Sequence, residues 1–144
     1  MSNISLKIGV AANQEQTLKA LNTTEGLSKW WTNDVSGETS EGGVILFRFG
    51  EGGLDMQVTN DTNDGIAWKC IAGPDEWIGT EVVFTLKDEN ETVIYFQHKG
   101  WEEENPFHYH CSMKWATFLL SLKQYLDEGI GQPFPDDQKI STVA

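Results

Sequence analysis

One long, uninterrupted helix near the end of the chain constrains the fold more than any other feature. Asn105 and Pro106 supply a helix cap and a proline for the first turn, and no helix-breaking residue follows as far as Asp127. The apolar residues of this segment form two stripes, one of Cys111, Trp115, Phe118, Leu122 and Tyr125 and one of Tyr109, Met113, Ala116 and Leu120. Because a helix with more than one apolar face must be covered by other elements, we expect the rest of the chain to enclose it over much of its circumference.

Strand patterns dominate the residues that precede this helix. Residues 4–10 alternate apolar and polar side chains, and two short helices are predicted next, one over residues 14–21 and one capped by Thr24. Alternating segments then recur roughly every dozen residues with turn residues between them, which is typical of an antiparallel meander. Their alternating residues are Ile45, Phe47 and Phe49; Leu54, Met56 and Val58; Ile66, Trp68 and Cys70; Thr80, Val82, Phe84 and Leu86; and Thr92, Ile94, Phe96 and His98.

The order of these elements determines how they can be layered. A sheet must cover its apolar face, and the final helix is the only long element available to do so. We therefore predict an α+β domain in which a curved antiparallel sheet wraps round the long C-terminal helix, while the two short helices close one end. Residues 1–135 are assigned to this single domain and residues 136–144 to a C-terminal tail.

Four segments of the chain resemble the AHSA1-like family, which is named for the activator of the Hsp90 ATPase and belongs to the START-like, or SRPBCC, superfamily. They are 21–32 (LNTTEGLSKWWT), 77–86 (WIGTEVVFTL), 98–101 (HKGW) and 115–133 (WATFLLSLKQYLDEGIGQP). The resemblance implies the helix-grip (START-like, Bet v 1-like) fold with a cavity between sheet and helix. The superfamily includes lipid carriers, polyketide cyclases and plant hormone receptors. Short family members look like the isolated C-terminal domain of the eukaryotic co-chaperone, so the family name alone does not give the function.

Large aromatic residues are the candidates for lining that cavity. Leu27, Trp30 and Trp31 fall on one helical face, so the paired tryptophans are expected to point inward. Core packing is the alternative interpretation for each ring, because one buried tryptophan covers about 150–250 Å². The predicted ligand-binding residues are Trp30, Trp31, Phe49, Trp68, Phe84, Phe96, His98, Trp101, Trp115 and Phe118.

His98 shares the apolar face of its strand with Ile94 and Phe96, so it is expected to point inward. A hydrogen-bonded structural role is one interpretation, and orientation of a ligand is another. No catalytic residue is predicted unless the protein is an enzyme, in which case His98 is the candidate general base. His108 and His110 fall on different faces of the helix, so no metal site is predicted, and no glycine-rich phosphate loop or other cofactor motif is present.

Charge and composition narrow the range of partners. The net charge of −12 and the lack of a basic stripe argue against nucleic acid and against an anionic membrane surface. No apolar run approaches the roughly 20 residues of a membrane helix. Cys70 and Cys111 lie in apolar patterns and are expected to be buried free thiols. With no signal peptide evident, a cytoplasmic protein is expected, as a monomer or homodimer.

Three functions remain open from the sequence. The first is a binding module that holds a small hydrophobic or aromatic molecule between sheet and helix. The second is a chaperone-associated interaction protein that works through its surface, as the family name suggests. The third is a cyclase or hydrolase type of enzyme, which would need His98 and a second acid or base within the cavity.

Overall fold

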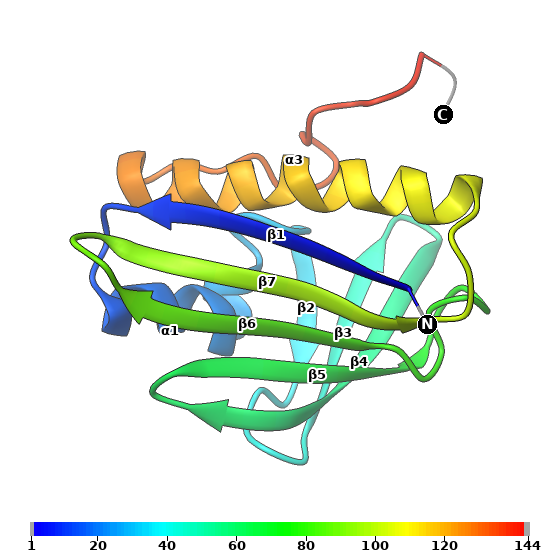
Figure 1. Cartoon of the computed structure of the whole chain (residues 1–144), viewed down its shortest axis with the longest axis horizontal. Helices are drawn as coiled ribbons and strands as arrows, with labels where there is room; N and C mark the ends of the chain where they lie inside the picture. The colour runs from blue at the N-terminus through cyan, green and yellow to red at the C-terminus, as the bar shows by residue number, and fades with distance from the viewer. Residues whose placement is uncertain (1, 143–144) are drawn as a thin grey trace.

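The predicted architecture is confirmed by the computed structural model, which describes residues 2–142 (Figure 1). A curved seven-stranded sheet lies beside one long helix, with two short helices between the first and second strands. The elements, in chain order, are β1 (Ser2–Val10), α1 (Gln14–Asn22), α2 (Thr24–Leu27), β2 (Asp34–Gly37), β3 (Val44–Phe49), β4 (Gly52–Thr62), β5 (Gly65–Ala72), β6 (Glu81–Asp88), β7 (Thr92–Trp101) and α3 (Pro106–Glu128).

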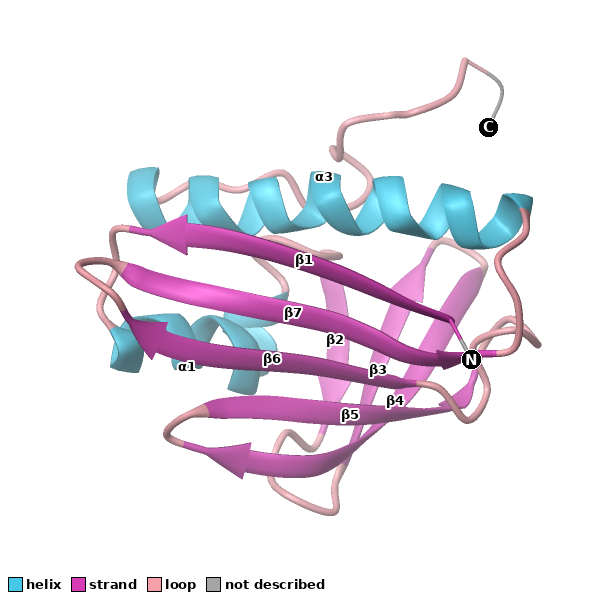
Figure 2. Ribbon diagram, viewed as in Figure 1, coloured by secondary structure: helices cyan, strands magenta, loops and turns pink. Residues whose placement is uncertain are grey.

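The sheet is antiparallel throughout, in the order β1-β7-β6-β5-β4-β3-β2. The first strand therefore pairs with the last, and the rest form a meander that ends at the short strand β2. The register between β4 and β5 shifts twice, between Asp55 and Met56 and between Val58 and Asn60. Such irregularities bend a sheet, and Figure 2 shows β2, β3 and β4 turned across the far side of the molecule relative to β1, β7 and β6.

Local signals explain where the helices begin and end. Asn13 and Gln16 form the reciprocal hydrogen bonds of a capping box at the start of α1. At α3, the side chain of Asn105 accepts a hydrogen bond from the backbone N–H of His108 at 3.0 Å, and Pro106 occupies the first turn. Gly129 ends α3 with a φ of 87°, a conformation that glycine adopts without strain.

The enclosure predicted for α3 is wrong for one of its two apolar stripes. Tyr109, Met113 and Leu120 are 61%, 57% and 59% exposed, whereas the stripe that begins at Cys111 is buried as far as Leu122. The reason is visible in Figure 1, where α3 runs beside the edge strand β1, so that the sheet covers it from one side only. The exposed stripe is an apolar face that no described element covers.

Two smaller features also differ from the sequence prediction. The edge strand β2 was not predicted, because its four residues carry no alternating apolar pattern. The helix α2 ends at Leu27, so Trp30 and Trp31 lie in the turns that follow it. Both tryptophans are nevertheless buried as predicted, because the backbone N–H of Trp31 still bonds to the carbonyl of Leu27 at 3.2 Å and keeps the helical direction.

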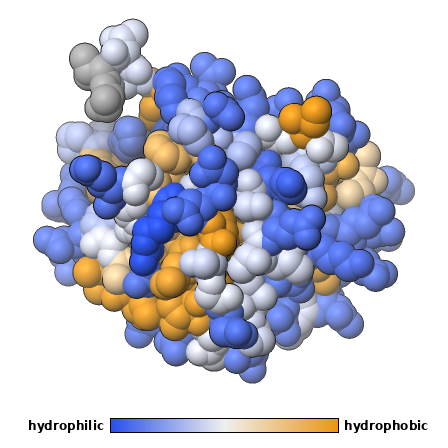
Figure 3. All heavy atoms as spheres, turned by 180° about the vertical axis from the view of Figure 1, so that it is seen from behind, coloured by the Kyte–Doolittle hydropathy of each residue, from blue (hydrophilic) through white to orange (hydrophobic). Residues whose placement is uncertain are grey.

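The face seen in Figure 3 is mostly hydrophilic, and its apolar residues gather mainly in one area. Within residues 2–142, no helix combines the length and the apolar character that crossing a membrane requires.

Candidate functional site

His98 lies at the centre of a buried hydrogen-bond network. The indole N–H of Trp115 donates to His98 Nδ1 at 3.1 Å, and His98 Nε2 lies 2.8 Å from the hydroxyl oxygen of Thr80. That hydroxyl in turn donates to the carbonyl of Trp77 at 2.5 Å. Because Nδ1 accepts a bond, the proton of the neutral ring must be on Nε2, where it can donate to Thr80.

Burial fixes the charge state of this histidine. The ring has no exposed surface, and its removal from water lowers the pKa of His98 from 6.5 to about 3, with a smaller contribution in the same direction from nearby His108. A histidine that is neutral at physiological pH, with both ring nitrogens occupied, serves to hold its neighbours in position. Here those neighbours are Trp115 and, through Thr80, Trp77.

The middle of the domain is filled by aromatic side chains. Trp31 stacks with both Trp30 and Trp68, with ring centroids 5.9 Å apart in each pair. Phe84 contacts Trp68 and Phe96 edge-on. All of these rings are at most 2% exposed. The centre of the grip, where a cavity was expected, is therefore packed core.

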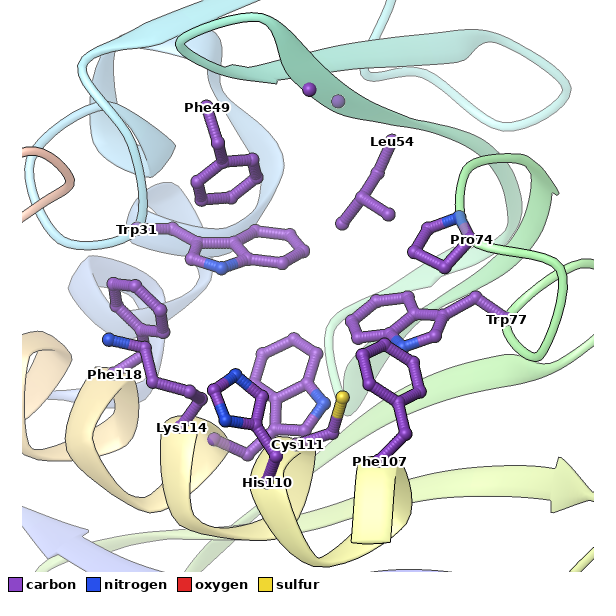
Figure 4. A pocket seen from close by; sticks show the side chains of 13 residues that line it. Trp31, Phe49, Leu54, Pro74, Trp77, Phe107, His110, Cys111, Lys114 and Phe118 are labelled. Atoms are coloured by element: carbon purple, nitrogen blue, oxygen red, sulfur yellow. The ribbon is translucent and has the colours of Figure 1, made fainter. Parts of the chain in front are cut away.

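A pocket of about 230 Å³ remains at one end of this core (Figure 4). It lies between the N-terminal half of α3, the adjoining ends of β3 and β4, and the loop that joins β5 to β6. Its lining residues are Trp31, Phe49, Gly52, Gly53, Leu54, Pro74, Trp77, Phe107, His110, Cys111, Lys114, Trp115 and Phe118.

Aromatic rings form most of the pocket wall. Trp77 and Trp115 stack with centroids 5.9 Å apart and planes 21° from parallel, and both are tied to the network around His98. Across the pocket, Trp31 and Phe49 make an edge contact at 5.7 Å. Figure 4 shows the sulfur of Cys111 between these walls. Burial raises the pKa of the Cys111 thiol to about 11, so it contributes no charge at neutral pH.

The C-terminal segment braces one side of the pocket. Phe134 forms an isolated bridge with Thr32, and its ring packs against Phe49 at 5.5 Å. Asp137, in the segment assigned to a tail, is buried and accepts hydrogen bonds from Lys114 and Lys139. Burial alone would raise the pKa of Asp137, but these two ammonium groups outweigh it and hold the pKa below its ordinary value.

The structure brings only some of the predicted site residues together. Four of the ten line the pocket, namely Trp31, Phe49, Trp115 and Phe118. The other six lie in the packed core or its hydrogen-bond network, outside that lining, namely Trp30, Trp68, Phe84, Phe96, His98 and Trp101.

Several pocket residues were not predicted from the sequence. One face at the start of α3 supplies several pocket residues at helical spacing: Phe107, His110, Cys111, Lys114 and Phe118. A search for a helical stripe in this segment would have found the first four, which were not predicted. Leu54 was predicted as an inward-facing strand residue but not as pocket wall. Pro74 and Trp77 lie in a loop without periodicity, and no sequence signal identified them.

No group of three or more histidine, cysteine, aspartate or glutamate side chains within residues 2–142 is arranged to hold a metal ion. The pocket lining itself contains no aspartate and no glutamate. What the arrangement offers chemically is a flat aromatic enclosure with a few N–H groups at its margin.

No family model matches the chain, and no curated protein matches it. Among solved structures, the Aha1 dimer from Colwellia psychrerythraea is 46% identical, with a TM-score of 0.83 over 91% of this chain and 100% of the Colwellia chain. The protein BH1534 of Bacillus halodurans is 20% identical, with a TM-score of 0.72 over 88% of this chain and 98% of its own. CalU16 from Micromonospora echinospora is 14% identical, with a TM-score of 0.74 over 93% of this chain and 71% of its own.

The last two similarities establish the helix-grip fold alone. The first covers the whole Colwellia chain, with 46% of the residues identical. This chain belongs to the same family as the Aha1 protein of Colwellia psychrerythraea, within the START-like helix-grip superfamily.

Proposed function

We propose that the protein is a binding module that holds one small aromatic or hydrophobic molecule in the pocket at the start of α3. The observation that carries this proposal is the pocket itself, an apolar space with aromatic walls beside a core that is otherwise closely packed. Small-molecule sites are typically concave and lined by apolar and aromatic side chains with few polar groups.

The size of the pocket limits the ligand. An engineered apolar cavity of about 150 Å³ binds benzene, so the 230 Å³ found here has room for one or two fused rings. It is smaller than the range of about 300–1,000 Å³ that is common for drug-sized ligands. The proposal is therefore a compact aromatic molecule and not a long lipid chain.

This function does not use His98 as a base. The ring is neutral, both of its nitrogens are engaged, and it lies behind Trp115 outside the pocket lining. Its part in the proposal is to fix the planes of the two indoles against which a ligand would lie.

A fluorescence titration with 1-aminonaphthalene, a two-ring probe of the size that the pocket admits, tests the proposal. The key variant is Gly52→Phe, because Gly52 pairs with Phe49 and so directs its side chain to the same face of the sheet. A Cβ at Gly52 meets nothing closer than the Phe49 carbonyl oxygen at 3.9 Å, so the new side chain has space to enter the pocket. The matched control is Gln57→Phe, on the same strand but on the opposite face from buried Met56 and Val58.

The native protein and Gln57→Phe should bind the probe, and Gly52→Phe should lose at least tenfold in affinity. Equal binding by all three proteins would place the probe elsewhere and would refute the proposed site. A failure of the native protein to bind this two-ring probe would refute the binding function.

A chaperone-associated role is the second candidate, supported by the 46% identity to the Aha1 protein of Colwellia. Under this proposal the family is the AHSA1-like family of Hsp90 ATPase activator homologues, and the partner is an Hsp90-type chaperone. A pull-down with a purified Hsp90-type chaperone tests it. Retention that is the same for native protein and Gly52→Phe would favour a surface interaction independent of the pocket, and no retention would exclude this candidate.

A homodimer is also proposed, because the Colwellia protein is a dimer. The exposed apolar stripe on α3 is the face we assign to the second copy, with Met113 near its centre. Light scattering after size-exclusion chromatography should give a dimer for the native protein and a monomer for Met113→Glu. A native monomer, or a dimer unaffected by this change, would contradict the assignment.

A further inference from the structure

We infer that the ligand carries a hydrogen-bond acceptor, a carbonyl or carboxylate oxygen, which binds between the indole N–H of Trp31 and the imidazole of His110. The aromatic body of the ligand then lies against Trp77 and Trp115. This inference rests on the proposed function of the pocket and specifies the chemical class of its ligand.

Trp31 supplies the first of these two donors. Its side chain is 2% exposed, yet its indole nitrogen makes no hydrogen bond within the described residues. In contrast, the nitrogen of Trp30 donates to the carbonyl of Ala20 at 2.8 Å and that of Trp115 donates to His98. Figure 4 shows the Trp31 nitrogen on the edge of the ring that faces the pocket. This nitrogen is not one of the polar atoms that are sealed from solvent without a partner, so it is accessible from the pocket. An acceptor that enters the pocket can therefore form a hydrogen bond with it.

His110 lies on the opposite side of the same space. Its ring is held parallel to Phe107, with centroids 6.3 Å apart and planes 11° from parallel. In Figure 4 one edge of the imidazole is turned toward the interior of the pocket, in the direction of Trp31. Within residues 2–142 the ring nitrogens of His110 have no hydrogen-bond partner, so one of them is available to donate to a ligand.

The remaining polar groups of the lining also favour an acceptor on the ligand. The indole nitrogen of Trp77 is enclosed without an oxygen or nitrogen partner, and the neighbouring thiol of Cys111 is only a weak acceptor. Lys114 contributes its alkyl stem, because its ammonium group lies 4.7 Å from the Phe118 ring centroid and pairs with Asp137. Since no carboxylate lines the pocket, its side chains offer N–H donors but almost no acceptors, and an acceptor-bearing ligand complements them.

A matched pair of probes tests the inference. 2-Acetylnaphthalene carries a carbonyl oxygen, and 2-isopropenylnaphthalene has nearly the same shape with a CH₂ group in its place. The six tryptophans give six indole N–H signals in a ¹⁵N-correlated NMR spectrum, so each can be followed separately. We expect the ketone to bind about tenfold more tightly, which corresponds to one hydrogen bond of about 1.4 kcal/mol. The ketone should shift the Trp31 indole proton downfield, while the signal of Trp30 should stay in place.

Variants of the other donor make the test specific. His110→Phe keeps an aromatic ring beside Phe107 but removes the nitrogens, and should reduce the preference for the ketone. Tyr109→Phe is the control, because it removes a hydroxyl from the adjacent, outward-facing residue and should leave the preference unchanged.

The outcomes separate this inference from the function on which it rests. Equal affinity for the two probes, with no selective shift of Trp31, would overturn the acceptor inference and leave the aromatic binding function intact. Failure of both probes and of 1-aminonaphthalene to bind would overturn the binding function itself.

Discussion

Replacing His98 should change how the stability of the protein depends on pH. In the folded state burial lowers the pKa of His98 from 6.5 to about 3, so between these values the unfolded chain binds a proton that the folded chain does not. Stability therefore falls as the pH falls through this interval. At about pH 5 the unfolded histidine is largely protonated and the folded one is not, which destabilises the fold by about 2 kcal/mol relative to pH 8. The limiting loss below pH 3 is about 5 kcal/mol.

The assay is urea denaturation of the native protein and His98→Asn at about pH 8 and pH 5. Carboxylates titrate in both proteins, so the quantity of interest is the difference between their stability losses. His98→Asn retains a side-chain oxygen that can accept from Trp115, and although it is less stable at pH 8 it should lose about 2 kcal/mol less on acidification. His110→Asn, at an exposed position on α3, is the control and should follow the native protein. If His98→Asn lost as much stability as the native protein, the neutral, buried state assigned to His98 would be refuted.

Three further predictions concern other parts of the structure. Cys70 and Cys111 are buried thiols with pKa values raised to about 11 by burial, so neither should react with Ellman's reagent at about pH 8 until the protein is unfolded; rapid native labelling would contradict this. Asn105→Ala removes the cap of α3 and should cost about 1 kcal/mol in urea unfolding, whereas an unchanged midpoint would show that the cap is dispensable. Asp137→Asn leaves the ammonium of Lys114 without its buried carboxylate and should destabilise the fold by about 1–2 kcal/mol; a truncation before residue 136 that retains full stability would refute the bracing role of this segment.

The fold was accessible from the sequence because its main signals are local and strong. The cap at Asn105, the unbroken run to the end of α3 and the repeated two-residue alternation before it leave few arrangements that bury all apolar faces. How much of the α3 surface is covered by other elements could not be predicted in the same way. Whether Tyr109 and Met113 are covered depends on the position of α3 beside the edge strand β1, and these two segments are distant in sequence.

The candidate site was harder to predict, because a pocket is the space that side chains fail to fill. The alternating pattern correctly predicted that Trp68, Phe84 and Phe96 point inward. It cannot distinguish a ring that fills the interior from one that borders an empty space. His98 was recognised as inward from its pattern, while its neutral state depends on contacts with Trp115 and Thr80 that are distant in sequence. Pro74 and Trp77 reach the pocket only because the β5–β6 loop folds over it.

The most direct test of the account is an isotope-filtered NOESY spectrum of the ¹³C-labelled protein with unlabelled 2-acetylnaphthalene. The account predicts contacts from the naphthalene protons to Leu54, Pro74 and Phe118, which border the pocket from three different elements. Contacts confined to the outer stripe of α3, at Met113 and Leu120, would contradict the claim that this pocket is the binding site.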